Sequence, residues 1–149
     1  GRVVGNLVHS ARTPAASEEE EESRGVEAVG FCSADVNPHW CATGGVDGVL
    51  KVWDLATLAC RHSCVHEGAG GITRLRWHAH RPLVYTASSD AAVRLWDARS
   101  GACLRTLTGH ADMINDLAIL FPPAGEAGED VVVTGSDDGT TRIFLVGHD

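Results

Sequence analysis

Basic residues are scarce in this sequence. Lysine and arginine together number 12 against 20 aspartate and glutamate residues, which gives a formal net charge of -8 at pH 7. No cluster of lysine or arginine compensates locally. Because neutralising phosphates requires a cationic surface, the composition argues against nucleic acid as a partner. It favours a basic protein partner, since complementary charge raises encounter rates.

Long apolar runs are also lacking. No segment approaches the roughly 20 apolar residues that a membrane-spanning helix needs, and the first residues lack the apolar core of a signal peptide. The five cysteines are an odd number scattered through apolar segments, which is typical of reduced thiols rather than of a disulfide framework. We therefore expect no membrane span and a cytoplasmic location that extends to the nucleus.

Methionine is nearly absent, whereas glycine and tryptophan are plentiful. A chain of 149 residues with 17 glycines, four tryptophans and one methionine favours tight turns and large rigid packing groups, as in all-β proteins. A turn that leads into an alternating strand occurs three times, in residues 44–54, 87–97 and 135–144. A loop over residues 122–129 lengthens the spacing before the third copy. The pattern predicts a repeat protein.

These copies resemble the WD40 family, whose repeat is a four-stranded propeller blade with Gly-His near its start and Trp-Asp near its end. The matching signatures are Gly109-His110, Trp53-Asp54 and Trp96-Asp97. Phe144 departs from the pattern, because it keeps an aromatic ring but has no indole N–H to donate. The resemblance covers nearly the whole chain and implies an all-β fold of WD40 β-propeller blades.

The repeats divide the chain into predicted units. Residues 1–9 are predicted to be the outer strand of a preceding or shared blade, and residues 10–25 an acidic disordered loop. Three blades are then expected over residues 26–65, 66–108 and 109–149, the last without its outer strand. Strands are predicted at residues 2–8, 26–32, 40–44, 49–54, 60–64, 72–77, 84–88, 93–97, 103–107, 114–120, 131–135 and 140–146.

Three blades are too few for a closed ring, because propellers typically have four to eight. An open arc would leave unpaired apolar faces. We therefore predict that the chain is part of a larger propeller. Its partners would be the remaining blades of a longer polypeptide, or a second copy of the chain in a six-bladed ring.

The order of several segments resembles the C-terminal repeats of the angio-associated migratory cell protein family. These segments are residues 1–5, the acidic serine-rich insert, and residues 26–33, 54–57, 61–66 and 93–101. The resemblance implies a longer WD40 protein with an acidic N-terminal region and a link to cell migration. Its fungal relatives escort a newly made large-subunit ribosomal protein. The implied function is a non-enzymatic interaction scaffold that binds or escorts a basic client such as a ribosomal protein.

In WD40 blades a His, a Ser or Thr, an Asp and a Trp commonly form a buried hydrogen-bond relay, which fixes a tight turn onto the inner strand. Matching positions are His66, Thr86, Asp90 and Trp96 in the second copy, His110, Thr134 and Asp138 in the third, and Thr43, Asp47 and Trp53 in the first. The first copy is predicted to lack its histidine, whose place falls in the acidic insert. Phe144 is predicted to truncate the third relay.

The same residue types leave a hydrolase or a metal protein as alternative functions. A hydrolase is disfavoured, because no G-x-S-x-G motif occurs and the His and Asp recur once per repeat. A metal site is suggested by four residues that alternate along one predicted strand, namely Cys60, His62, Cys64 and His66. Same-face side chains lie about 6.5 Å apart along a strand, so two can share an ion but four cannot. We therefore predict no catalytic residue, metal or cofactor, and we expect His78 and His80 to be solvated loop residues.

Candidate contacts with a partner lie outside the predicted strands. Glu18, Glu19, Glu20, Glu21 and Glu22 form an acidic run that cannot bury itself, and they serve either solubility alone or attraction of a basic client. Glu67 and Met113 fall in loops that connect an outer strand to the next inner strand. These loops are expected to be exposed at one face of the ring. Met113 is predicted either to contact a partner or to cap the edge of a blade.

Overall fold

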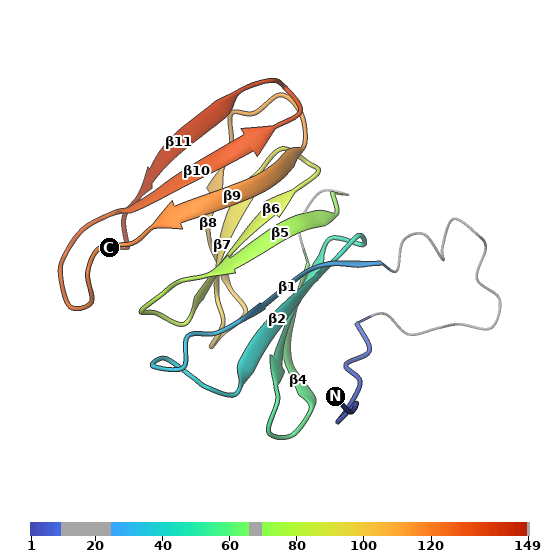
Figure 1. The fold of residues 1–149 in the computed structure, drawn as a ribbon. Helices are drawn as coiled ribbons and strands as arrows, with labels where there is room; N and C mark the ends of the chain where they lie inside the picture. The colour runs from blue at the N-terminus through green and yellow to red at the C-terminus, as the bar shows by residue number, and fades with distance from the viewer. Residues whose placement is uncertain (10–24, 66–69, 149) are drawn as a thin grey trace, which may run out of the picture.

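The computed structural model describes residues 1–9, 25–65 and 70–148, and the described chain is built of β-strands (Figure 1). The strands are β1 (Val26–Phe31), β2 (Trp40–Gly45), β3 (Val49–Asp54), β4 (Ala59–Val65), β5 (Ile72–Trp77), β6 (Leu83–Ser88), β7 (Val93–Asp97), β8 (Cys103–Leu107), β9 (Ile114–Leu120), β10 (Asp130–Ser136) and β11 (Thr141–Val146). No helix in these described ranges has the length and apolar character needed to cross a bilayer.

Three antiparallel sheets follow one another along the chain, and we call them the first, second and third blade. The strand orders are β1-β2-β3-β4, β5-β6-β7-β8 and β11-β10-β9. The inner strands β1, β5 and β9 lie side by side, and the other strands of each blade extend away from them (Figure 1). This arrangement confirms the expected all-β propeller blades.

The predicted strands from residue 26 onward are all present, with ends within one residue of those expected. The N-terminal strand differs from the prediction, because residues 1–8 form no strand in this structure. A strand requires a hydrogen-bonded neighbour, and no described strand pairs with these residues. The described chain therefore holds eleven strands rather than the twelve expected.

The turn between the second and third strands of each blade is specified locally. In the third blade, a side-chain oxygen of Asp138 accepts a hydrogen bond from the Thr140 N–H at 2.8 Å, as Asp and Asn often do in turns. The residue after the aspartate has a positive φ, which is 78° at Gly48, 69° at Ala91 and 79° at Gly139. Glycine adopts this conformation without steric cost, so the second blade carries strain at Ala91 that the other two avoid.

The apolar core consists of two clusters, one on each side of the second blade. The first cluster joins residues such as Leu50 and Val52 to Leu75 and Trp96. The second joins residues such as Tyr85 and Leu95 to Ile114, Leu117 and Val132. Both faces of the second blade are therefore covered. As a result, all six residues of its strand β6 are buried.

The first and third blades each present an apolar face to solvent. In β1, Val29 and Phe31 are 71% and 76% exposed, and in β11, Ile143 and Leu145 are 69% and 64% exposed. Side chains alternate between the faces of a strand, so each row lies on the face turned away from the second blade. These two faces are where a larger propeller would continue.

Candidate functional site

The third blade contains the predicted relay. His110 Nδ1 lies 2.8 Å from Asp138 Oδ2, to which it donates, and Nε2 lies 2.6 Å from the Thr134 hydroxyl. The imidazole is fully enclosed, with 0% of its side chain exposed. The ring therefore ties the β10–β11 turn to the segment that leads into β9, as the sequence predicts.

Asp138 is the anion of this relay. The Thr140 hydroxyl is the main cause that holds the pKa of Asp138 well below its ordinary value, with the Ala111 N–H and His110 adding to the effect. Hydrogen bonds to a carboxylate favour its charged form. Asp138 is thus a fixed negative acceptor within the turn. It accepts hydrogen bonds from His110, Ala111 and Thr140, all within the third blade.

Phe144 truncates the third relay in the way expected. In the first two blades an indole N–H donates to the relay threonine, at 2.9 Å from Trp53 to Thr43 and at 3.0 Å from Trp96 to Thr86. Thr134 receives no such donor from Phe144 and instead donates to a backbone carbonyl of β11 at 3.4 Å. The hydroxyl is still paired, so the substitution changes the partner without leaving a buried polar group alone.

The first blade has a relay histidine, contrary to the prediction. His9 Nδ1 lies 2.7 Å from the Thr43 hydroxyl, and its Nε2 lies 3.5 Å from Asp47 Oδ1. The side chain is 2% exposed, and burial is the main cause that lowers its pKa. The histidine lies before the acidic insert, whereas the spacing of the other copies places it within the insert, where the sequence has none.

The second blade uses an arginine in its turn. Arg94 donates to Asp90 Oδ2 at 2.7 Å, and both side chains are mostly buried. The pKa of Asp90 is lowered because bonds from Arg94 and Ser88 outweigh the opposing effect of burial, which is the largest single contribution. Arg94 was not among the site residues predicted from the sequence. Its place at the fourth residue after Asp90, between the apolar residues Val93 and Leu95, was the available signal.

Some predicted residues fall outside the described residues. These are the relay histidine His66, the acidic residues Glu18, Glu19, Glu20, Glu21 and Glu22, and the candidate contact Glu67. Their predicted roles stay predictions.

A buried cluster that the sequence analysis missed joins the second and third blades. Asp130, with 0% of its side chain exposed, accepts from the Tyr85 hydroxyl at 2.6 Å and lies 2.7 Å from His148 Nε2 and 3.2 Å from His78 Nε2. His78 is therefore not the solvated loop residue that we expected, although His80 is exposed. Burial is the main cause that lowers the pKa of His78 and that raises the pKa of Tyr85.

The same cluster is the set of described residues with ligand atoms close enough to share a metal ion, since the atoms of His78, Asp130 and His148 lie within 4.8 Å of one another. However, His78 Nδ1 accepts the backbone N–H of His80 at 3.0 Å. A neutral imidazole carries one proton, so this bond places the proton on Nε2, which faces Asp130. A metal would need that nitrogen bare, and the arrangement therefore favours a hydrogen-bond network.

The Cys and His row of β4 does not form a ligand set in the described residues. His62 Nε2 lies 2.8 Å from the Arg99 carbonyl, and the Cys60 thiol donates to a backbone carbonyl at 3.4 Å. Burial raises the pKa of Cys64 to about 11. Because thiolates are the metal-binding form, this row serves packing between the first and second blades.

One face of the described arc carries a pocket built from all three blades. It has a volume of about 580 Å³ and collects the β2–β3 turn, the β6–β7 turn and the β8–β9 loop. Its lining residues are Glu27, Val46, Gly71, Ile72, Thr73, Arg74, Ser89, Met113 and Asn115. Met113 is partly buried at this pocket, and its carbonyl accepts from the Asp137 N–H at 3.0 Å.

The charges around this pocket are mostly negative. Glu27, Asp112 and Asp137 are exposed, whereas Arg74 and Arg76 share the Asp116 carboxylate at 3.7 and 3.5 Å. An apolar methionine inside an acidic rim suits a partner that carries an apolar anchor among basic residues.

Comparison with known proteins agrees with this geometry. The family model described as WD domain, G-beta repeat matches residues 24–54, 59–97 and 101–144. The chain is 42% identical to the angio-associated migratory cell protein of Homo sapiens over 98% of this chain and 32% of that protein. It is 36% identical to an uncharacterized WD repeat-containing protein of Schizosaccharomyces pombe over 99% of this chain and 34% of that protein. The chain thus spans about a third of the length of these curated relatives.

A similar solved structure is that of Sqt1 from Saccharomyces cerevisiae. The TM-score is 0.75 at 24% sequence identity, and the match covers 87% of this chain and 33% of the other. At this identity the similarity concerns the fold alone.

Proposed function

Because the chain belongs to the WD40 repeat family, we propose that it is a non-enzymatic scaffold that binds a basic protein client through the face carrying Met113. The observation that supports this most is the pocket of about 580 Å³ to which every blade contributes. The histidines and aspartates that suggested catalysis are used inside the blades, where His110 and Asp138 bond to each other. This use favours a structural role over a hydrolytic one.

The client's charge follows from the acidic rim and from the net charge of -8. A newly made ribosomal protein has that charge and is the client that the family resemblance implies, together with a link to cell migration. The five cysteines lie among the described residues as free thiols, which supports a reducing compartment, either cytoplasmic or nuclear.

The two exposed apolar faces call for a partner of another kind. We propose that further blades of a longer polypeptide cover Val29 and Phe31 on one side and Ile143 and Leu145 on the other, since the chain matches about a third of its curated relatives. A second copy of the chain is the rival, and it would give a six-bladed ring. Light scattering separates them, because a monomer contradicts the ring and a stable dimer contradicts the need for other blades.

Substitution of Met113 tests the client face. We expect Met113→Ala to weaken binding of a dye-labelled peptide, with lysines around a central leucine, by about tenfold, because central apolar anchors carry most of the binding free energy. Fluorescence anisotropy at two salt concentrations measures it, and higher salt should weaken binding to the unaltered chain.

Leu58→Ala is the matched control for this experiment. Leu58 is an exposed apolar residue in the β3–β4 turn, at the opposite edge of the first blade from Val46. It should leave the affinity unchanged. Equal binding by the Met113→Ala chain and the unaltered chain would remove the basis for assigning the client to this face.

A further inference from the structure

The inner strand of each blade has a β-bulge near its beginning. At this point one extra residue interrupts the register with the second strand of the same blade. The three extra residues are Glu27 in β1, Thr73 in β5 and Asn115 in β9. All three line the pocket at Met113. A bulge re-aims a side chain out of the regular alternation of a strand, so each blade directs a polar side chain to this pocket.

Two of these polar side chains are held within the described blades. The Thr73 hydroxyl donates to the Ile114 carbonyl, and the Asn115 amide donates to Asp137. Glu27 differs, because its exposed carboxylate has neither a hydrogen-bond nor an ion-pair partner among the described residues. An unpaired carboxylate beside a pocket is available to a basic side chain of a partner.

Arg74 follows the bulge of β5 and is the one cation among the described residues that line this pocket. Its Nε lies 3.7 Å from Asp116 Oδ1, and Arg76 lies 3.5 Å from the same oxygen, so two guanidinium groups share one carboxylate. The side chain of Arg74 is 47% exposed, and the Thr73 carbonyl accepts one of its several N–H donors at 3.1 Å. A net positive charge with further donors therefore lies beside the pocket.

Glu27 and Arg74 are opposite charges that do not neutralise each other. They lie on the inner strands of neighbouring blades, β1 and β5, which pack side by side, yet the described residues include no ion pair between them. A client side chain is therefore attracted to one and repelled by the other according to its own charge. Met113 adds an apolar surface in the same pocket. The pocket thus distinguishes charge by position and not only by amount.

We propose that the client segment bound at this pocket is basic except for one carboxylate, which pairs with Arg74. A lysine or arginine of the same segment pairs with Glu27, and its apolar anchor contacts Met113. This preference rests on the proposed function and narrows it, because attraction to the acidic rim alone would select any basic segment. Glu27 and Arg74 are then the residues that determine which basic client is accepted.

Pairs of dye-labelled peptides test this preference by fluorescence anisotropy with the full chain. Each peptide has lysines around a central leucine, and one neighbour of the leucine is aspartate in one peptide and asparagine in the other. The pair is made twice, with the varied residue before or after the leucine, because the segment can bind in either direction. If only net charge mattered, the aspartate peptide would bind this acidic chain more weakly. We expect about fivefold tighter binding of the aspartate peptide in at least one pair, because its carboxylate pairs with Arg74.

Three variants assign the preference to these side chains. Arg74→Gln should abolish it, because the guanidinium that pairs with the carboxylate is lost. Glu27→Gln should weaken both peptides of a pair about equally and leave the preference intact, because the partner of the lysine is lost. Asp116→Asn should increase the preference, since it removes the carboxylate that competes for Arg74. Loss of folded structure cannot produce that increase.

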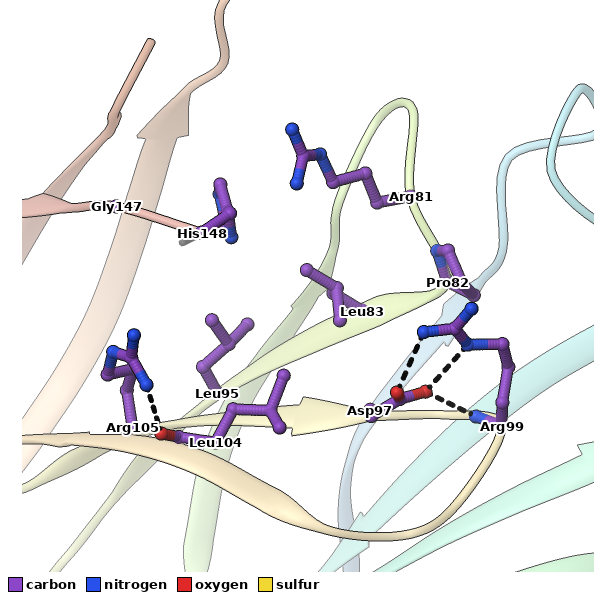
Figure 2. A pocket seen from close by; sticks show the side chains of 10 residues that line it. All are labelled: Arg81, Pro82, Leu83, Leu95, Asp97, Arg99, Leu104, Arg105, Gly147 and His148. Carbon is purple, nitrogen blue, oxygen red and sulfur yellow. Dashed lines mark hydrogen bonds and ion pairs between the residues drawn. The ribbon is translucent and has the colours of Figure 1, made fainter. Parts of the chain in front are cut away.

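Arg81→Gln and Glu126→Gln are the matched controls, because they remove the same charges from exposed sites elsewhere. Arg81 follows β5, at the other end of this strand from Arg74. Figure 2 shows it in a separate pocket, of about 410 Å³, together with Leu83 and His148. Glu126 lies in the β9–β10 loop. Both variants should retain the preference, and thermal unfolding of every variant verifies that the blades remain folded.

Equal binding of the aspartate and asparagine peptides in both pairs would overturn the proposal, as would a preference that persists in Arg74→Gln. The client face would still stand in these cases if Met113→Ala weakens binding of the lysine peptide that has no aspartate. If the unaltered chain binds none of the peptides, the client face is wrong and the preference at Arg74 falls with it.

Discussion

Replacement of Asp130 by alanine is expected to lower the free energy of unfolding by about 3–5 kcal/mol. The carboxylate is fully buried and lies within hydrogen-bond distance of Tyr85, His78 and His148. Its removal leaves donors of two blades in the interior with no acceptor, and a buried polar group without a partner is costly. Urea unfolding followed by tryptophan fluorescence measures the change.

Asp130→Asn and Asp35→Ala are the matched controls. Asn retains one acceptor oxygen and should cost less than alanine, whereas Asp35 is exposed and should cost little. If Asp130→Ala unfolds at nearly the same urea concentration as the unaltered chain, the cluster does not hold the second and third blades together.

The pH dependence of unfolding checks the same cluster. Burial lowers the pKa of His78 and of His9 in the folded state below their ordinary value of 6.5. As the pH falls below 6.5, the unfolded chain takes up these protons before the folded chain does, so stability decreases. A second loss follows below pH 3.8, because the pKa of Asp97 and that of Asp138 are lowered in the folded state. His78→Gln should reduce the first loss and leave the second.

The blades could be predicted from sequence because their determinants are local. Alternation sets each strand, and an aspartate followed by a residue of positive φ sets each central turn, as at Asp138 and Gly139. The relay partners Thr134 and Asp138 also lie at fixed positions relative to one turn. The WD40 resemblance, applied at the spacing of the repeats, therefore located them.

The Asp130 cluster could not be predicted in this way. Its bonds join residues that are 45 and 52 positions apart in the sequence, from two blades. Asp130 follows a loop of prolines, glycines and acidic residues, which are typical of solvent exposure. Only the packing of the third blade against the second turns it into a buried acceptor.

His9 was not predicted for a different reason, which is its distance along the sequence from β1. Gly109-His110 precedes β9 closely, so the matching place before β1 falls in the acidic insert, and the first blade was predicted to lack its histidine. A relay histidine is fixed by its distance from Thr43, and the chain between it and β1 can lengthen without moving it. The acidic insert adds residues between His9 and β1, so the spacing seen in the third copy does not lead to His9.

The two relay histidines are expected to differ in their contribution to stability. We expect His110→Ala to lower the free energy of unfolding by about 2–4 kcal/mol, because it opens a cavity and removes a partner from Asp138. Thr134 retains its bond to a carbonyl of β11 and Asp138 retains Thr140, so the loss combines the cavity with the removed 2.8 Å bond between His110 and Asp138. Urea unfolding at neutral pH gives the value.

His9→Ala is the comparison that makes this prediction specific. His9 holds Thr43 at 2.7 Å but lies 3.5 Å from Asp47, so its loss should cost about 1–2 kcal/mol, less than that of His110. His39→Ala, at an exposed histidine, should cost little. Equal losses for His9→Ala and His110→Ala would show that the distance to the turn aspartate does not set the strength of the relay. The turn aspartates lie beside the proposed client face. A weak relay in the first blade would therefore leave the β2–β3 turn less stable than the matching turns of the other blades.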